Sequence, residues 1–240
     1  MTDKTITLLQ LYPRDMNIYG DWGNTLVLKR RLEWHGYNVD LKSYDPGDKF
    51  PDNIDMIVGG GGQDSGQDKI QTDLLKISDR LHSLADNGVP MLMICGMYQL
   101  FGKFFKTRDG HIIEGISIFN LETYGGKERM IGNIVTESED FGKIIGYENH
   151  SGQTVLGGDV RPLGKVLKGA GNNGRDETEG ARYKNVIGTY MHGSLLPKNP
   201  NIADWMIEQS IKRKFGDCEL SVIEDRFAEM ARDAALRRPR

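Results

Sequence analysis

The chain has 240 residues, of which 38% are hydrophobic and 27% are charged, as is typical of a globular protein with a substantial core. The formal net charge of -3 gives no electrostatic basis for binding nucleic acid or a membrane surface. The sequence has no apolar run of the ~20 residues that cross a bilayer and no signal-peptide pattern, so we expect a cytoplasmic protein without a transmembrane segment. Two cysteines are too few for a disulfide framework, so we expect both to be reduced.

The first half of the chain alternates between expected strands and helices. In chain order, the pattern predicts a strand at 5–11, a helix at 22–36, strands at 39–44 and 55–58, a helix at 68–85, a strand at 91–95 and a helix from 97 toward 105. Strands that alternate with helices of this length form βαβ units and a parallel sheet. We therefore predict an α/β fold, a three-layer sandwich with a mostly parallel central sheet.

The second half of the chain is richer in strands. The pattern predicts strands at 112–122, 129–136, 143–148, 155–156 and 186–192, a loop or weakly ordered hairpin at 164–182, and helices at 202–215 and 220–236. Since no internal repeat or domain-scale linker is present, we expect one domain over residues 1–218. Residues 219–240 are expected to form a helix and tail, whose apolar positions either dock on a partner or pack on the chain's own sheet.

Cys95 stands where an apolar strand gives way to a helix. The strand expected at 91–95 ends in this thiol, and Gly96 follows at once. Such a turn presents a nucleophile at the carboxyl edge of a sheet, and the helix N-terminus behind it stabilises a thiolate. The alternative is a buried structural cysteine.

Four consecutive glycines at 59–62 follow the strand expected at 55–58. The run does not match the glycine-rich motifs that bind phosphate. Glycines at a strand end can expose backbone N–H groups where a side chain would block approach. Because this strand lies beside or near the Cys95 strand in such a sheet, we expect the loop amides and the Gly96 amide to form an oxyanion hole. An ordinary tight turn is the alternative.

His192 is the candidate for the base that a thiol nucleophile needs. It ends the strand expected at 186–192, and Gly193 follows it. A histidine at the carboxyl edge of a later strand can meet Cys95 at the same edge of the sheet. The alternative is a structural histidine whose nitrogens are satisfied by hydrogen bonds.

The ordered set of short motifs resembles one enzyme family. The elbow I-C-G-M-Y-Q at 94–99 and the later G-T-Y-M-H-G at 188–193 are similar to the class I glutamine amidotransferase domain, in its cobyric-acid-synthase-like branch. Three further motifs, G-G-G-G-Q-D at 59–64, G-Y-E-N-H at 146–150 and G-N-N-G-x-D-x-x-E-G at 171–180, narrow the resemblance to the glutaminase subunits of lipid II isoglutaminyl synthases. The resemblance covers nearly the whole chain.

The resemblance implies roles for individual residues. Cys95 would be the nucleophile, His192 its base, and Arg129 the residue that holds the substrate glutamine. Further substrate contacts are expected at Gly60, Gly61, Gly62, Gly96 and Gln99. No metal is expected, because no cluster of His, Cys and Asp shows the spacing of metal ligands.

The sequence departs from the family pattern at two places. Met93 and Met97 stand where the wider family usually has glycine, so we expect a more crowded elbow. Ser194 occupies the place of the glutamate that orients the histidine in many members. The orienting group is therefore left open among three acidic residues: Glu148, Asp21 and Asp15.

The implied reaction is hydrolysis of L-glutamine through a thioester, with delivery of ammonia to a second subunit. That subunit would be MurT, a Mur-ligase-like protein that binds ATP and amidates D-glutamate in the lipid II stem peptide at the inner face of the membrane. No cofactor is expected in this chain, which has no nucleotide-binding motif. Three alternatives are a glutaminase for another synthetase, as in cobyrinate amidation, a DJ-1-like cysteine hydrolase, and a non-enzymatic binding module.

Overall fold

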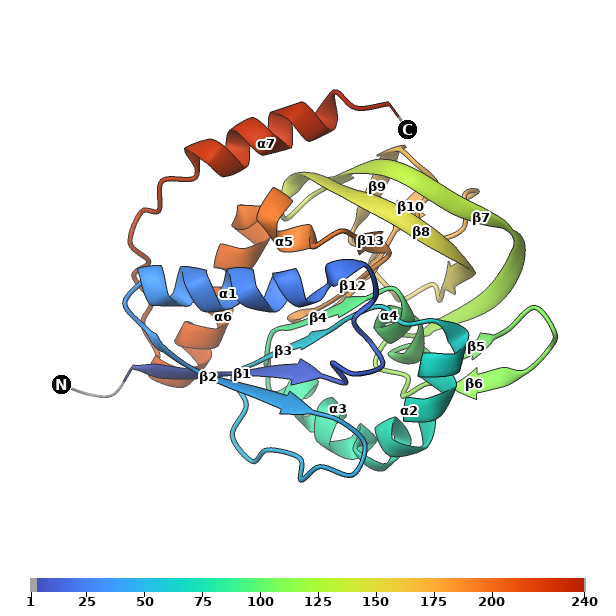
Figure 1. Ribbon diagram of the computed structural model, residues 1–240, viewed down its shortest axis with the longest axis horizontal. Coiled ribbons are helices and arrows are strands. Elements are labelled where there is room, and N and C mark those ends of the chain that lie inside the picture. Colours follow the sequence, from blue (N-terminus) through green and yellow to red (C-terminus); the bar gives the residue numbers. More distant parts are fainter. Residues whose placement is uncertain (1–3, 240) are drawn as a thin grey trace.

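The computed structural model describes residues 4–239, and its centre is a six-stranded sheet (Figure 1). The strands in spatial order are β11 (Ala181–Tyr183), β12 (Val186–Thr189), β4 (Met91–Ile94), β3 (Met56–Gly59), β1 (Thr5–Leu11) and β2 (Asn38–Tyr44). All neighbours pair in parallel except β11 and β12. The inner strands are almost wholly buried, as expected where helices cover both faces of a sheet.

Helices cover both faces of this sheet, which confirms the predicted three-layer α/β arrangement (Figure 1). One face carries α1 (Trp22–Trp34), α5 (Leu195–Lys198) and α6 (Pro200–Phe215). The other carries α2 (Asp64–Lys76), α3 (Ser78–Asp86) and the short α4 (Gly96–Leu100). A 3₁₀ turn, η1 (Ile18–Gly20), precedes α1.

A second sheet of seven strands lies at the carboxyl edge of the first. Its strands are β5 (Phe104–Lys106), β6 (Ile112–Glu114), β7 (Leu121–Ser138), β8 (Gly142–Leu156), β9 (Gly164–Lys168), β10 (Thr178–Glu179) and β13 (Met191–His192). The long antiparallel pair of β7 and β8 curves along one side of the molecule (Figure 1). This sheet forms one wall of the candidate site described below.

Two helices predicted in the first half of the chain have wrong boundaries. The helix expected at 68–85 is α2 and α3, which are separated at Ile77, whose φ of -94° and ψ of 5° are not helical. The helix expected from 97 toward 105 ends at Leu100. Residues 104–106 form β5 instead, because strands on both sides offer backbone partners there. Gly102 permits the close approach, since a Cβ at this position would lie 2.1 Å from Leu121 Cδ1.

The strands of the second sheet also differ from the prediction. The strand expected at 112–122 ends at Glu114, its last two residues begin β7, and the strand expected at 129–136 lies in the second half of β7. The strands expected at 143–148 and 155–156 are one strand, β8. Polar residues interrupt the alternation in the sequence, but backbone pairing between β7 and β8 continues through them, with a register shift between Gly125 and Met130.

The glycine- and asparagine-rich segment at 164–182 contains the antiparallel pair β9 and β10, so of the two predicted forms it is the hairpin that is observed. Asn172 holds its loop and is fully buried. The Asn172 Oδ1 accepts hydrogen bonds from the Gly180 amide and the Tyr98 hydroxyl, both at 3.0 Å, and its Nδ2 donates to the Gly180 carbonyl. The order of this segment therefore rests on hydrogen bonds to one buried amide. The segment has no apolar pattern from which that order could have been predicted.

The prediction of a single strand at 186–192 is wrong, because the chain passes from the first sheet to the second at Tyr190. β12 ends at Thr189 in the first sheet, whereas β13 pairs with β8 in the second. The Tyr190 amide donates to Glu179 Oε1 at 2.9 Å, so a side chain and not a neighbouring strand satisfies it. This change of sheet places His192 between the two sheets, at the edge where Cys95 lies.

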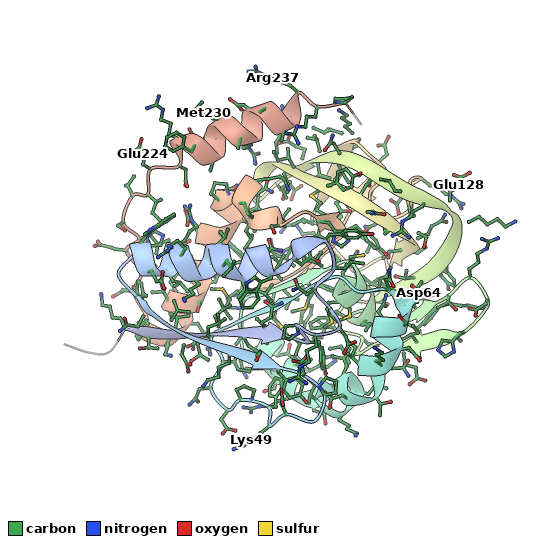
Figure 2. The ribbon with its side chains drawn as sticks, in the orientation of Figure 1. Lys49, Asp64, Glu128, Glu224, Met230 and Arg237 are labelled. Atoms are coloured by element: carbon green, nitrogen blue, oxygen red, sulfur yellow. The ribbon has the colours of Figure 1, made fainter. Side chains whose placement is uncertain are left out.

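The C-terminal helix α7 (Arg226–Leu236) lies on the outside of the molecule, against α5 and β8 (Figure 1). It begins later than the predicted residue 220. None of its described side chains is buried, and Figure 2 shows Met230 on this outer helix.

Candidate active site

Cys95 lies on the turn between β4 and α4. Its φ of 48° and ψ of -100° fall where non-glycine residues are rare. The Cys95 amide donates to the Thr189 carbonyl at 2.8 Å, and the Cys95 carbonyl accepts a hydrogen bond from the Gln99 amide at 2.9 Å. Backbone strain of this kind is found where a nucleophile is held in place. The expected strand, sharp turn and helix are therefore present around the thiol.

The glycine loop lies directly beside this turn, because β3 and β4 are neighbours. A Cβ on Gly96 would come within 2.9 Å of the Gly62 nitrogen, so the two turns can meet only because residue 96 is glycine. The Gly61 amide is not free for the expected oxyanion role, since it donates to Asp21 Oδ2 at 2.7 Å. The Gly62 and Gly96 amides remain candidates for an oxyanion hole.

His192 and Asp21 form a buried pair at the same edge. His192 Nδ1 lies 3.4 Å from each carboxylate oxygen of Asp21, and the two side chains are 1% and 0% exposed. The Nε2 atom has no hydrogen-bond partner among residues 4–239 and is available for proton exchange. Burial disfavours the charged imidazole, but the Cys95 sulfur and the Asp21 carboxylate raise the pKa of His192 to about 10. The imidazole is therefore held in its positively charged form beside the Cys95 sulfur at neutral pH.

Asp21 is the acidic residue that the geometry places against the histidine. Glu148 accepts hydrogen bonds from the amides of Ala170 and Gly171 and so holds the 164–182 segment. Asp15 pairs with Lys69, 3.2 Å away. Of the three predicted candidates, only Asp21 contacts His192 through a described bond.

Ser194, at the place of the missing glutamate, acts on the loop that carries Asp21. Its hydroxyl donates to the Gly20 carbonyl at 2.7 Å. It also lies so close to α1 that a Cβ on Gly23 would meet Ser194 Oγ at 2.1 Å. The serine thus joins the end of β13 to the loop that supplies the carboxylate.

A cavity of about 400 Å³ opens beside Cys95, a size that admits a small ligand. The predicted residues Gly62, Gln99 and Arg129 line it together with the thiol. The Arg129 guanidinium is held at two atoms: Nε donates to Asn149 Oδ1 at 2.6 Å and Nη2 donates to the Tyr19 hydroxyl at 3.3 Å. The structure therefore brings the predicted cation and the predicted nucleophile to one cavity.

The two methionines expected to crowd the elbow pack against the first glycine of the loop. A Cβ on Gly59 would lie 2.9 Å from Met93 Sδ and 3.0 Å from Met97 Cγ. Gly60 is equally confined, since its Cβ would lie 2.3 Å from the Met16 carbonyl oxygen. Gly60 therefore allows close packing against the Met16 backbone, and the missing side chain of Gly59 leaves room for Met93 and Met97.

Comparison with known proteins identifies the family. Residues 7–200 match the model for the CobB/CobQ-like glutamine amidotransferase domain, and this range contains the thiol, the histidine and the glycine loop. The chain belongs to the CobB/CobQ-like glutamine amidotransferases. In this member of the family, Cys95, the imidazole of His192 and the carboxylate of Asp21 lie together at one edge of the first sheet.

Two relatives of this glutamine amidotransferase are 38% identical to it. They are the lipid II isoglutaminyl synthase (glutamine-hydrolyzing) subunit GatD of Staphylococcus aureus, over 87% of this chain and 86% of that protein, and the subunit of the same name from Streptococcus pneumoniae, over 92% and 86%. A protein named probable cobyric acid synthase from Methanothermobacter thermautotrophicus is 30% identical, over 65% of this chain but 33% of its own length.

Solved structures agree with the fold of this amidotransferase. A crystal structure described as a glutamine amidotransferase superposes with a TM-score of 0.59 and covers 84% of this chain and 98% of that chain. A glutamine amidotransferase from Thermotoga maritima superposes with a TM-score of 0.54, over 97% and 90%. Each is 14% identical in sequence, so the likeness concerns the fold.

Three further observations on residues 4–239 of this amidotransferase concern its cysteines, its possible metal ligands and the length of its helices. Both cysteines, Cys95 and Cys218, are free thiols. No group of three or more His, Cys, Asp or Glu in this range could hold a metal ion. Within the same range, every helix is too short or too polar to cross a membrane.

Sequence reasoning missed Tyr19 and Gln67, which both line the cavity. Tyr19 has a φ of 58° in η1, and its ring meets His192 edge-on with the ring centres 5.0 Å apart. Gln67 was missed because the helix was expected to begin at Asp68, whereas α2 begins at Asp64. The glycine run and the polar residues directly after it were the available signal for this earlier start.

Replacing Gly61 with alanine is expected to lower kcat/KM for glutamine roughly 10²-fold, because the added Cβ would lie 2.6 Å from His192 Cε1 and displace the imidazole. The measurement is steady-state glutamate release, with the melting temperature as a check on folding. Gly158→Ala is the matched control, since a Cβ there meets nothing within 4 Å. Equal activity of the two variants would contradict the placement of His192.

Proposed function

We propose that this chain is the glutaminase subunit of a lipid II isoglutaminyl synthase. It would hydrolyse L-glutamine and pass the ammonia to a MurT-like, Mur-ligase-type partner, which amidates D-glutamate in the lipid II stem peptide during peptidoglycan biosynthesis. The observation that carries this proposal is the 38% identity to two GatD subunits over 87% and 92% of this chain. ATP would bind to the partner, and the reaction would take place at the cytoplasmic face of the membrane.

In the proposed chemistry, Cys95 passes its thiol proton to His192 Nε2, and the thiolate Sγ attacks the side-chain carboxamide carbon of glutamine. As the S–C bond forms, the carbonyl oxygen becomes an oxyanion that the Gly62 and Gly96 amides stabilise. His192 Nε2 gives its proton to the nitrogen, the C–N bond breaks, and ammonia leaves a glutamyl thioester. His192 then takes a proton from water, whose oxygen displaces the thiolate and releases glutamate.

Arg129 is proposed to pair with the α-carboxylate of glutamine. Its guanidinium presents further N–H donors to the cavity in a planar arrangement that suits a carboxylate. The Tyr19 hydroxyl and Asn149 Oδ1 fix the guanidinium from the side. Gln99, which donates to the Tyr190 hydroxyl at 3.1 Å, forms part of the inner wall.

Helix α7, in the 219–240 segment, is proposed as a docking element for the partner. Polar contacts hold it to the body: Arg232 donates to the Lys198 carbonyl and to Asn199 Oδ1, both at 2.7 Å. Its apolar residues Phe227 and Met230 remain 79% and 58% exposed. An apolar surface of this kind on an element that is fixed in place is typical of a protein interface.

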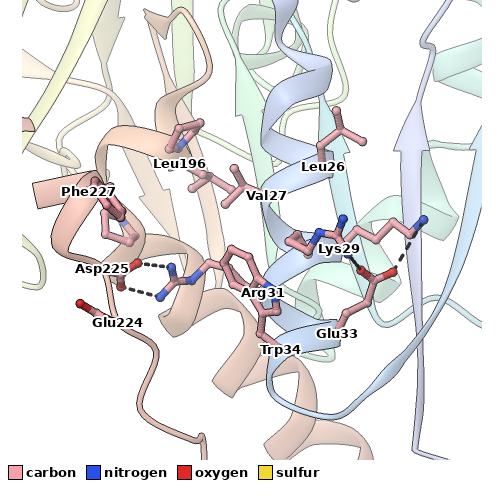
Figure 3. Close-up of a pocket in the computed structure, with 14 residues that line it drawn as sticks. Leu26, Val27, Lys29, Arg31, Glu33, Trp34, Leu196, Glu224, Asp225 and Phe227 are labelled. Carbon is pink, nitrogen blue, oxygen red and sulfur yellow. Dashed lines mark hydrogen bonds and ion pairs between the residues drawn. The ribbon is translucent and has the colours of Figure 1, made fainter. Parts of the chain in front are cut away.

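A groove beside the start of α7 continues this apolar surface (Figure 3). Its volume is about 620 Å³, and Leu26, Trp34 and Phe227 contribute to its lining. The Arg31 guanidinium bonds both Asp225 oxygens, at 2.6 and 2.8 Å, and so fixes the first turn of α7 over α1. The groove and the exposed face of α7 form one candidate surface for the proposed partner.

Replacing Phe227 and Met230 with aspartate is expected to weaken the complex with the MurT-like partner by about 30-fold or more, since buried charge at an interface centre costs at least ~2 kcal/mol. The measurement is the dissociation constant by calorimetry. Ile112→Asp, at an exposed apolar residue (50%) on β6, is the control. An unchanged affinity in the double variant would exclude this face of α7 from the interface.

The partner itself is tested by co-purification with a MurT-like protein. We expect a stable complex whose glutamate release from glutamine depends on Cys95 and whose ATP-dependent product is amidated lipid II. Amidation of cobyrinate by a different synthetase, with no complex formed with the MurT-like protein, would replace the proposed acceptor and leave the glutaminase role in place.

A further inference from the structure

The cavity beside Cys95 contains a buried hydrogen-bond acceptor that the chemistry above does not use. Gln67, in the first part of α2, is 2% exposed and lines this cavity. Its Nε2 donates to Gln99 Oε1 at 2.9 Å, but its Oε1 has no hydrogen-bond partner among residues 4–239. A buried oxygen without a partner has lost its bonds to water without replacing them, so a donor that enters the cavity would stabilise it.

The hydrogen bonds next to Gln67 determine which of its two side-chain atoms, Oε1 or Nε2, has no partner. Gln99 Nε2 donates to the Tyr190 hydroxyl at 3.1 Å, so Gln99 turns its Oε1 toward Gln67. The Tyr190 hydroxyl is also 2.7 Å from Thr154 Oγ1, which continues the chain of bonds into the second sheet. Gln67 must therefore offer its Nε2 to Gln99, and its Oε1 is the atom without a protein donor.

His150 supplies a second acceptor in the lining of the same cavity. It is 3% exposed and stacks on Tyr190, with ring centres 3.6 Å apart and planes 4° apart. Its Nδ1 lies 2.8 Å from the Gly152 carbonyl, so Nδ1 carries the proton. Burial lowers the pKa of His150 to about 3, so the ring is neutral at pH 7. Its Nε2 then has a lone pair, and no hydrogen-bond partner in the described chain.

The polar groups of the cavity are thus of two kinds, charged hydrogen-bond donors and neutral acceptors. Arg129 provides positively charged donors, whereas Gln67 Oε1 and His150 Nε2 provide two unsatisfied acceptors. A ligand that satisfies both sets carries an anionic group for Arg129 and, close to it, a group with at least two hydrogen-bond donors. The α-carbon of a zwitterionic amino acid carries this pair, a carboxylate and an ammonium group.

We propose that Gln67 is a specificity-determining residue, whose Oε1 accepts a hydrogen bond from the α-ammonium group of L-glutamine. His150 Nε2 accepts a second one, while Arg129 binds the α-carboxylate. This inference rests on the proposed function for the placement of glutamine beside Cys95. It goes further by assigning recognition of the α-amino group to α2 and to the buried chain of bonds behind it.

The test compares L-glutamine with glutaramate, which has the same carboxamide and carboxylate but no α-amino group. With the assembled complex, we expect the wild type to favour L-glutamine in kcat/KM by at least about 100-fold. Gln67→Met should lower kcat/KM for L-glutamine roughly 10- to 100-fold and leave that for glutaramate within about threefold. Gln67→Glu, which keeps an acceptor oxygen, should retain more of the preference. Gln71→Met, on the same helix but outside the cavity lining, is the control.

Other outcomes would overturn the inference. An equal loss for both substrates in Gln67→Met would show that Gln67 only supports Gln99, and no loss would remove Gln67 from the site. Binding of both compounds to the Cys95→Ala complex, measured by calorimetry, separates this inference from the proposed function. If the wild type hydrolyses neither compound but Cys95→Ala still binds L-glutamine better than glutaramate through Gln67, the proposed chemistry fails and the recognition stands. If Gln67→Met does not change this binding preference, the recognition fails.

Discussion

Replacing Cys95 with alanine is expected to lower glutamate release from glutamine by at least about 10⁴-fold. The thiol is the atom that forms the thioester, and neither His192 nor the loop amides can substitute for it as a nucleophile. The strained turn at φ 48° belongs to the backbone and is braced by the Thr189 carbonyl, so we expect the variant to fold. The measurement is glutamate production by the assembled complex, together with its thermal unfolding.

The second free thiol offers a matched control for Cys95. Cys218 is half-buried near the C-terminus and lies outside the cavity. Cys218→Ala is therefore expected to retain full glutaminase activity. Added ammonium should restore amidation by a Cys95→Ala complex, because the synthetase partner is intact. Undiminished glutamate release by Cys95→Ala would exclude the thioester chemistry.

Replacing Asp21 with asparagine is expected to lower kcat roughly 10²- to 10⁴-fold, since the carboxylate both orients His192 and stabilises its charge. The asparagine carbonyl can still accept the hydrogen bond that the Gly61 amide now gives to Asp21, so the glycine loop should stay in place. The measurement is the pH profile of kcat. Asp15→Asn is the control, because Asp15 pairs with Lys69 and lies away from the histidine.

The direction of the pH effect follows from the pKa of His192. The Cys95 sulfur and Asp21 raise this pKa to about 10, against the effect of burial, so the imidazolium that protonates the leaving nitrogen is lost only as the pH rises through this value. Without the Asp21 charge the pKa falls, and the alkaline limb of the profile must move to lower pH. An alkaline limb that does not move in Asp21→Asn would show that the carboxylate does not act on His192.

The parallel half of the fold was predictable because its signals are local. Each inner strand is a short apolar run, and the helices between the strands have apolar positions at helical spacing. The second sheet was not predictable to the same degree, because long-range backbone pairing carries β7 and β8 through polar residues. The order at 164–182 depends on the buried amide of Asn172, which composition alone does not reveal.

The residues of the candidate site also differ in how far they could be predicted from the sequence. Cys95 could be found from its own neighbours, because a strand, a thiol and a glycine stand in direct succession. His192 was placed at the correct edge although the chain leaves the first sheet at Tyr190, two residues before it. The choice of Asp21 among three acidic residues, and the presence of Gln67 in the cavity, depend on loop paths that have no periodic signal.

Transfer of label from [amide-¹⁵N]glutamine to lipid II tests the central claim most directly. The complex of this chain with a MurT-like partner is supplied with ATP, lipid II and labelled glutamine, and the product is analysed by mass spectrometry. We predict ¹⁵N in the α-amide of the D-glutamate residue with the wild type, and none with Cys95→Ala. Glutamate release by the wild-type complex without any ¹⁵N in lipid II would contradict the proposed role.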